Sequence, residues 1–354
     1  MKVNHYIGMD AHCGVTELRV LTPSGRVTHR WRGPTTIPAL SEAISAVPRP
    51  RFVAVEEGGI ADWLLRSLSP LVDDFIICDP RRNHLISHEG DKDDGLDAQA
   101  LADLLRGGFL KRVHHPKTFD RIVFKQRVAL YHRSVRQRVR QANQIMGFLR
   151  YHGVFVRESV LANLENRTRI LSSLPPHRAL RSDVKLLWRS YDRAVDQVKK
   201  MRHRMIRLAR QEDIIVRFRA LPGVEWIRAS TLVAYLDTPW RFKSKSALWR
   251  YLGIGLERSQ SGNSPAKLRV ARDANRLLKD TILGAAQTAI RTGENPFAEQ
   301  YERWLDDGVS LRNARRNVAR SMAAVMWGMW KTGSAYEPTW VGATEPARKV
   351  MHAV

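Results

Sequence analysis

The sequence predicts a mixed fold, with an α/β domain at the N-terminus followed by two regions that are mostly helical. Before residue 80, short apolar or alternating segments recur between turn residues, which is typical of strands. After residue 115, apolar residues recur with a helical period in two long stretches. The remainder again shows helical segments, interrupted by a loop of Ser, Gly and Asn. We therefore predict three domains: residues 1–115, 116–218 and 219–354.

Strands and helices alternate in the first domain. Residues 3–10 form an apolar strand, and the alternating residues 13–21 and 26–31 flank a Thr-Pro-Ser-Gly turn signal, which predicts an antiparallel meander. The elements that follow are a helix at 37–46, a strand at 52–55, a helix at 61–68, a strand at 75–78 and a helix from Asp94 to Gly107-Gly108. This order, β-β-β-α-β-α-β-α, is that of a ribonuclease H/RuvC-like domain, in which the first and fourth strands are parallel neighbours.

Two long helical stretches make up the second domain. Apolar residues in the first recur about every 3.5 residues, the spacing of a packed helix seam: Val128, Val135, Val139, Ala142, Met146 and Leu149. The second stretch, Asp183–Arg210, has a similar row: Leu187, Tyr191, Ala194, Val198, Met201 and Met205. Because Pro175-Pro176 separates the two, we expect an antiparallel hairpin or coiled coil. Its seam is either an internal core or a dimer contact.

The net charge indicates a polyanionic partner. The chain has 59 Lys and Arg against 35 Asp and Glu, a formal charge of +24, and nucleic acid is the usual partner of such a surface. An anionic membrane is the alternative, but the sequence has no terminal basic amphipathic anchor. Residues 121–157 contain no acidic residue. Either this stretch is a solvated basic face or it binds nucleic acid, for which the candidates are Arg133, Arg136, Arg138 and Arg140.

Four carboxylates occupy positions that favour a metal site. Asp10 and Glu56 end the first and fourth predicted strands, so in parallel neighbours both would emerge at one sheet edge. Asp94 and Asp97 are three residues apart at a helix start and share one face. Four converging carboxylates repel one another unless cations neutralise them. Mg²⁺ or Mn²⁺ fits, because both prefer oxygen ligands and pair with phosphates.

Simpler interpretations of these acids remain open. Asp94 can cap its helix, Asp10 can begin a turn, and Glu57 competes with Glu56 for the strand end. The remaining acids near the helix start interact favourably with the helix dipole without any metal: Asp91, Asp93 and Asp97. The four carboxylates together, at these positions of the predicted fold, indicate a metal site much more specifically than any one of them does.

The third domain is predicted to be mostly helical, with helices near 227–236, 247–252, 273–292, 296–305 and 310–330. It opens with Leu-Pro-Gly-Val at 221–224, which suggests a helix-hairpin-helix turn that offers backbone N–H groups to phosphate. The loop 259–264, Ser-Gln-Ser-Gly-Asn-Ser, is flanked in sequence by basic residues that suit phosphate binding: Arg258, Lys267, Arg269 and Arg272. A serine needs activation to attack phosphorus, and these residues alone do not single out a nucleophile.

Over nearly its whole length the chain resembles the DEDD insertion-sequence transposases, the family that also includes the Piv invertases. YIGMDAH, FVAVEEGG and KDDGLDAQALADLLRGG resemble the family's three acidic motifs, and SQSGNS resembles its Ser-Gly loop. The resemblance assigns the metal ligands to Asp10, Glu56, Asp94 and Asp97 and the nucleophile to Ser261. Three positions depart from the family pattern: Glu225, Asn263 and Ala274. They leave the loop register open, so Ser259 is the alternative nucleophile.

The resemblance implies a recombinase that cleaves DNA and exchanges strands through a 5′-phosphoserine intermediate, with Mg²⁺ or Mn²⁺ at the carboxylates. It also implies double-stranded donor and target DNA, a structured non-coding bridge RNA, and a homodimer or homotetramer. The alternatives are a metal-only nuclease of the Holliday-junction type, an invertase of the same fold, and an inactive nucleic-acid-binding scaffold.

Two further expectations concern the cellular environment. No apolar run reaches the roughly 18–20 residues that cross a bilayer, and no apolar signal-peptide core is visible, so we expect a cytoplasmic protein. Cys13 and Cys78 have no metal-binding spacing and are expected to be reduced and partly buried thiols.

Overall fold

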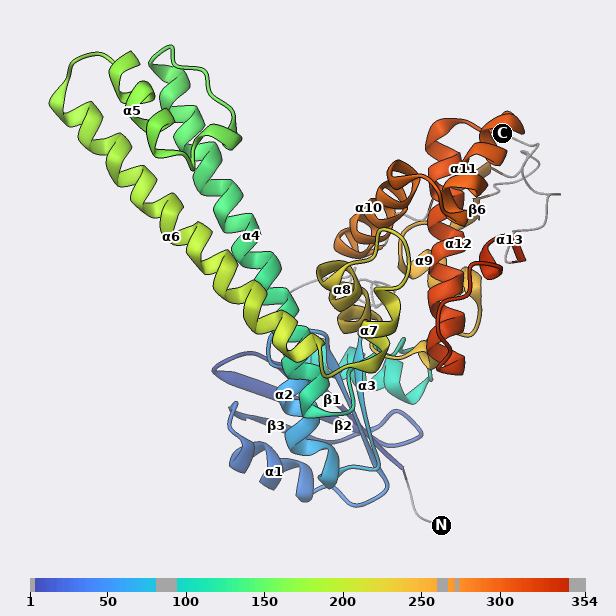
Figure 1. Cartoon of the computed structure of the whole chain (residues 1–354). Helices are drawn as coiled ribbons and strands as arrows, with labels where there is room; N and C mark the ends of the chain where they lie inside the picture. The colour runs from blue at the N-terminus through green and yellow to red at the C-terminus, as the bar shows by residue number, and fades with distance from the viewer. Residues whose placement is uncertain (1–3, 81–93, 260–266, 271–273, 344–354) are drawn as a thin grey trace. The chain divides into compact units, whose positions relative to one another are not determined.

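The computed structural model describes residues 4–80, 94–259, 267–270 and 274–343 (Figure 1). The chain forms two compact units, Met1–His115 and Pro116–Val354. A further division at residue 218 stays a prediction. Within the described residues, no helix combines the length and the apolar composition that crossing a membrane requires.

The first unit is built on a mixed five-stranded sheet with the strand order β3-β2-β1-β4-β5. Its strands and helices are β1 (His5–Ala11), β2 (Val15–Leu21), β3 (Val27–Pro34), α1 (Ile37–Ser45), β4 (Arg51–Glu56), α2 (Ala61–Leu68), β5 (Asp74–Cys78) and α3 (Asp94–Arg106). Strands β1, β2 and β3 pair antiparallel, whereas β4 lies parallel to both β1 and β5. The predicted meander and the predicted parallel pairing of the first and fourth strands are therefore confirmed.

Helices cover both faces of this sheet. Ile7 and Met9 of β1 are buried in an apolar core with residues of α1 and α2. Since neighbouring strand residues point to opposite faces, Gly8 faces the other side. There α3 packs so closely that a Cβ atom on Gly8 would stand 1.9 Å from the backbone oxygen of Ala98. The glycine thus sets how closely α3 approaches the sheet.

The second unit begins with a long helical hairpin. Helices α4 (Phe119–Tyr151) and α6 (Arg178–Ala209) lie side by side, with the short α5 (Leu164–Ser173) in the connection between them (Figure 1). The hairpin has its own apolar core at the end that carries α5: Ala142, Ile145, Leu149, Leu161, Ile170, Leu174, Val184, Trp188 and Tyr191. The prediction of a hairpin is confirmed, but Val139 was wrongly assigned to the seam, since it is 36% exposed.

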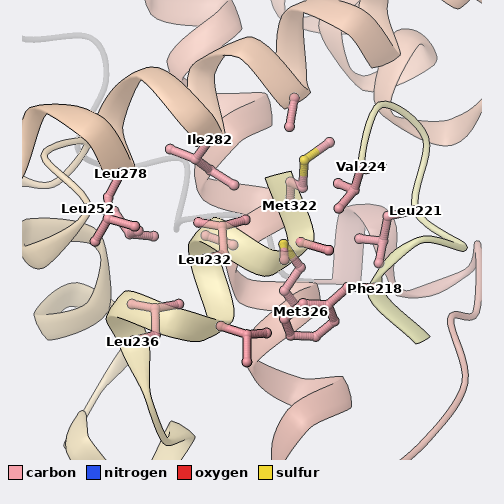
Figure 2. Close-up of a cluster of buried hydrophobic side chains, with 14 of the residues drawn as sticks. Phe218, Leu221, Val224, Leu232, Leu236, Leu252, Leu278, Ile282, Met322 and Met326 are labelled. Carbon is pink, nitrogen blue, oxygen red and sulfur yellow. The ribbon is translucent and has the colours of Figure 1, made fainter. Parts of the chain in front are cut away.

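The remainder of the second unit is mostly helical. It contains α7 (Asp213–Phe218), α8 (Trp226–Leu236), α9 (Lys245–Tyr251), β6 (Leu256–Ser259), β7 (Lys267–Val270), α10 (Arg276–Thr292), α11 (Pro296–Asp306), α12 (Leu311–Thr332) and α13 (Trp340–Ala343). Figure 2 shows its core, where Met322 and Met326 of α12 lie among Phe218, Leu232 and Ile282. The same core includes Phe124, Val128 and Met205 of the hairpin helices, so the base of the hairpin is packed into it.

Three details differ from the sequence-based expectations. Strands β6 and β7 pair antiparallel on either side of the predicted loop 259–264, where no strand was predicted, because strands of four residues carry little periodicity. Helix α10 begins at Arg276 and not at residue 273, because the side chain of Asn275 caps it by accepting from the backbone N–H of Leu277 and Leu278. Cys13 is exposed and only Cys78 is buried.

Candidate functional site

Asp10 and Glu56 follow directly on residues that are paired across parallel strands. Met9 of β1 pairs with Val55 of β4, so the next residue on each strand is the candidate acid. Neighbouring strands lie about 4.8 Å apart. Met9 and Val55 belong to the core beneath α1 and α2. By strand alternation, Asp10 and Glu56 share the opposite face, which α3 covers.

Helix α3 begins with the other two candidate acids. Asp94 is its first residue, and its side chain lies outside the described residues. Asp97 is exposed and precedes Ala98, the residue that contacts Gly8 in the middle of β1. The start of α3 is therefore packed against β1, the strand that carries Asp10. All four backbone positions are thus brought to one face of the sheet.

Glu17 is a fifth acid of this region, and sequence reasoning missed it. It pairs across the antiparallel strands with Asp10 and is only 5% exposed. Its carboxylate forms ion pairs with Arg19 at 3.0 Å and Arg32 at 3.5 Å. In the sequence of β2, Glu17 and Arg19 alternate with apolar residues and suggest a solvent-facing side. One sequence signal could have indicated this arrangement. Gly95 lies against the side chains of Glu17 and Arg19, and a glycine in the first turn of a helix can mark such a close approach.

The donor set suits a hard divalent cation, since it consists of carboxylate oxygens. Within the described side chains, no three His, Cys, Asp or Glu residues lie close enough together to hold a metal ion, and the Asp94 carboxylate is not among those side chains. Asp10 additionally contacts the ring Nε2 of His12 at 3.3 Å. Asp10, next to the last residue of β1, and Glu56, the last residue of the parallel strand β4, are the pair around which such a site would form.

The serine loop connects the two strands of a small hairpin. Ser259 is the last residue of β6, and β7 begins at Lys267. Ser261 lies outside the described residues, as do Arg272 and the side chains of the following residues: Arg258, Ser259, Lys267 and Arg269. The foot of the hairpin is fixed, because the Arg320 guanidinium of α12 donates from Nε to the backbone oxygen of Ile254 at 2.7 Å.

The Leu-Pro-Gly-Val turn has a packing role. Gly223 has a φ of +77°, and a Cβ atom there would stand 2.3 Å from the backbone oxygen of Ala285 in α10. The N–H of Val224 already donates to the carbonyl of Leu221. Only glycine meets both the left-handed backbone and the close approach. The predicted phosphate contact of this turn stays a prediction.

Basic side chains of α4 are largely available to a partner. Arg133, Arg136 and Arg140 are exposed along the helix. Arg138 is instead engaged in an ion pair with Glu158, at 2.8 Å. The three exposed arginines remain candidates for nucleic-acid contact, whereas a contact by Arg138 would compete with its ion pair.

His132 joins this basic stretch to helix α8. The Thr231 hydroxyl donates to the carbonyl of Ile227 at 2.7 Å, so its oxygen accepts from the Nε2–H of His132 at 2.8 Å. Burial, with a smaller contribution from Arg136, lowers the pKa of His132 to about 4. The imidazole is therefore neutral in the folded protein at pH 7.

We expect His132 to make the protein less stable in mild acid. Because its folded-state pKa is depressed, the unfolded chain binds a proton first, and stability falls as pH drops from the unfolded pKa of about 6.5 towards the folded value of about 4. The loss should be roughly 2 kcal/mol between about pH 6.5 and pH 5. Urea denaturation at both pH values measures it. In His132→Gln this part of the pH dependence should vanish, and an identical dependence in the variant would contradict the assignment.

One segment of the second unit is similar to a known protein family. Residues 216–302 match the model of the Transposase IS116/IS110/IS902 family, a segment that contains α8 to α10 and the β6–β7 hairpin. The putative transposase y4pF/y4sB of Sinorhizobium fredii is 22% identical over 291 residues, which cover 81% of this chain and 74% of that protein. The transposase for insertion sequence element IS1111A of Coxiella burnetii is 20% identical over 255 residues, covering 70% and 69%.

These similarities agree on one class of enzyme, although the matched family segment does not include the carboxylate positions. The two relatives extend the similarity over more than two thirds of the chain. Residues 216–302 are therefore similar to the IS116/IS110/IS902 transposases, and the chain is a DNA transposase, an enzyme of DNA recombination.

Proposed function

We propose that this transposase cleaves and exchanges DNA strands with two separate groups, a metal-binding set of carboxylates in the first unit and a serine nucleophile in the second. The observation that carries the proposal is the placement of Asp10 and Glu56 on adjacent parallel strands, next to the last residue of β1 and at the last residue of β4, on the face covered by the helix that begins at Asp94. The same element order and pairing suit a ribonuclease H/RuvC-like domain.

The carboxylates of Asp10, Glu56, Asp94 and Asp97 would hold one or two Mg²⁺ or Mn²⁺ ions, which supply positive charge against the phosphorane-like transition state. The oxygen-only donor set supports this assignment. Four carboxylates on one face repel one another unless a cation supplies counter-charge. The negative face therefore serves to gather cations and, through them, phosphate.

Ser261 is the proposed nucleophile. Its Oγ attacks the scissile phosphorus, the bond to the 3′ oxygen breaks, and that oxygen leaves with a proton as a 3′ hydroxyl. The 5′-phosphoserine then accepts attack by the 3′ hydroxyl of the other strand, which restores the serine. Its place in the loop between β6 and β7, inside the matched family segment, supports this role. Ser259 is the alternative in that loop.

Double-stranded donor and target DNA are the proposed substrates, and a structured bridge RNA is the proposed guide. A net charge of +24 and the exposed arginines of α4 suit a backbone-reading surface, while base pairing would supply sequence specificity. Because two duplexes must be joined, the working form is a homodimer or homotetramer. The reaction would take place in the cytoplasm, where the element's DNA lies.

A covalent trap tests this mechanism. Purified protein would be incubated with cognate DNA, Mg²⁺ and co-expressed RNA, then denatured and separated on a gel beside Ser261→Ala and Asp10→Ala. We expect a protein–DNA adduct that is lost in both variants. Ser259→Ala is the matched control in the same loop and should keep the adduct.

Two other results of the covalent trap would change the proposed mechanism. Cleavage without an adduct, insensitive to Ser261→Ala but lost with Asp10→Ala, would identify a metal-only nuclease of the Holliday-junction type. An adduct that survives Ser261→Ala and disappears with Ser259→Ala would move the nucleophile by two positions and leave the chemistry unchanged.

A further inference from the structure

Helix α12 carries a row of arginines beside the foot of the serine hairpin. Arg312, Arg316 and Arg320 are four residues apart and so share one face of the helix. Exposure falls along the row: Arg312 is exposed, Arg316 is half-buried and Arg320 is 8% exposed. The row therefore runs from solvent into the protein, ending at the residue that contacts Ile254.

Arg320 is held rigidly at the inner end. Its Nε donates to the oxygen of Ile254, two residues before β6, and its Nη1 donates to Asn317 Oδ1 at 2.8 Å. Its own backbone oxygen accepts from the indole N–H of Trp249, at 3.0 Å. A guanidinium has five N–H donors. Arg320 thus ties α12 to the strand that leads into the serine loop.

Positive charge accumulates along this face without an acidic partner. Among the residues that the structure describes, no ion pair reaches Arg312, Arg315, Arg316 or Arg320. Burial, followed by the charges of Arg312 and Arg315, lowers the pKa of Arg316. Burial and then Arg316 lower the pKa of Arg320 to about 10. The cations therefore repel one another in the free protein.

Arg315 also has an unused donor in this region. Its Nη1 donates to Gln287 Oε1 of α10 at 3.1 Å, while its buried Nε has no hydrogen-bond partner within the described residues. A buried polar group without a partner costs free energy, as does repulsion between neighbouring cations. An anion that reaches this face would relieve both costs.

We propose that the arginine row Arg312–Arg316–Arg320 is a phosphate-binding site that holds the backbone of the DNA at the foot of the β6–β7 hairpin. This deepens the proposed function, on which it rests, by naming a surface that holds DNA phosphates beside the hairpin whose sequence carries the proposed nucleophile. Guanidinium groups match phosphate oxygens in paired hydrogen bonds, and such contacts position a duplex without reading its sequence. The positive charge of the row favours a polyanion such as DNA. The contact of Arg320 with Ile254 places the inner end of the row beside β6.

The test is DNA binding by the double variant Arg312→Gln, Arg316→Gln. Fluorescence anisotropy would be measured on duplex DNA carrying the element's end, without divalent metal, over a series of KCl concentrations. Affinity should fall about tenfold or more, and the slope of log affinity against log salt should decrease by about 2, since each lost phosphate contact removes about 0.9. Arg303→Gln is the matched control, because Arg303 is exposed at the end of α11 and outside the row.

The thermal midpoint of the double variant distinguishes a role of Arg312 and Arg316 in DNA binding from a role in folding. Removing mutually repelling cations should leave the thermal midpoint of the free protein unchanged or raise it. Affinity and salt slope equal to those of Arg303→Gln would overturn the proposal, as would a lowered midpoint with unaltered binding by the folded fraction. The assay contains no divalent metal and requires no cleavage, so a failure of the serine mechanism would show in the covalent trap and not here.

Discussion

Asp10→Asn is expected to abolish strand cleavage while the fold remains intact. The substitution keeps the size of the side chain and removes the charge that a divalent cation needs. Metal stabilisation of the transition state amounts to several kcal/mol, and each 1.36 kcal/mol is a factor of ten in rate, so the loss should be about three orders of magnitude. Cleavage of a donor plasmid by purified protein measures it, with circular dichroism as the check on folding.

Asp94→Asn and Asp97→Asn should have the same effect, because they carry the other half of the proposed ligand set. The matched control is Asp103→Asn, an acid in the last part of α3 that pairs with Arg106 at 3.1 Å and is remote in sequence from the first turn. The control should cleave at the normal rate. Retained cleavage in Asp10→Asn and in both α3 variants would place the metal site elsewhere in the chain.

Gly8→Ala is expected to give the largest loss of stability. The added Cβ atom would stand 1.9 Å from the oxygen of Ala98 and 2.6 Å from the nitrogen of Ala102, and both are backbone atoms that cannot rotate away. Helix α3 must therefore shift. Overpacking usually costs 1–3 kcal/mol, and a clash with backbone should cost about 3 kcal/mol or more. Cleavage should fall as well, because α3 carries Asp94 and Asp97.

Chemical denaturation monitored by circular dichroism tests this expectation. The matched control is Gly14→Ala, since no heavy atom lies within 4 Å of the Cβ position at Gly14. Its unfolding free energy should change by less than about 0.5 kcal/mol, the range of substitutions that touch nothing. If Gly8→Ala unfolds at the same denaturant concentration as this control, α3 does not lie against the middle of β1.

Local patterns determined most of the secondary structure. The helix 61–68 was predicted with the bounds that α2 has, and the helix start at Asp94 was also correct. Strand alternation, turn residues and helix stops act over a few residues, so a single sequence reveals them. The parallel pairing of β1 and β4 followed from element order, and it makes Asp10 and Glu56 neighbours.

The helical hairpin shows where local patterns end. A 3.5-residue spacing assigned Val139 to the seam, but the two apolar cores of the second unit leave that position exposed between them. The hairpin is one continuous pair of helices, yet its base packs with Phe218 and its tip with Leu161. Periodicity identifies a face of a helix, whereas the partner of that face differs along its length.

Three features were decided only by the tertiary structure. Glu17 looked solvent-facing until α3 covered that side of the sheet. Arg320 of α12 is buried and donates to the backbone oxygen of Ile254, a contact that no local pattern in the helix indicates. Gly8 was predicted in a strand and lies in β1, but only the packing of α3 shows that a Cβ atom there would stand 1.9 Å from the backbone oxygen of Ala98. The physical reason is the same in each case: burial and repulsion depend on residues distant in sequence, whereas strands, helices and their order follow from neighbours along the chain.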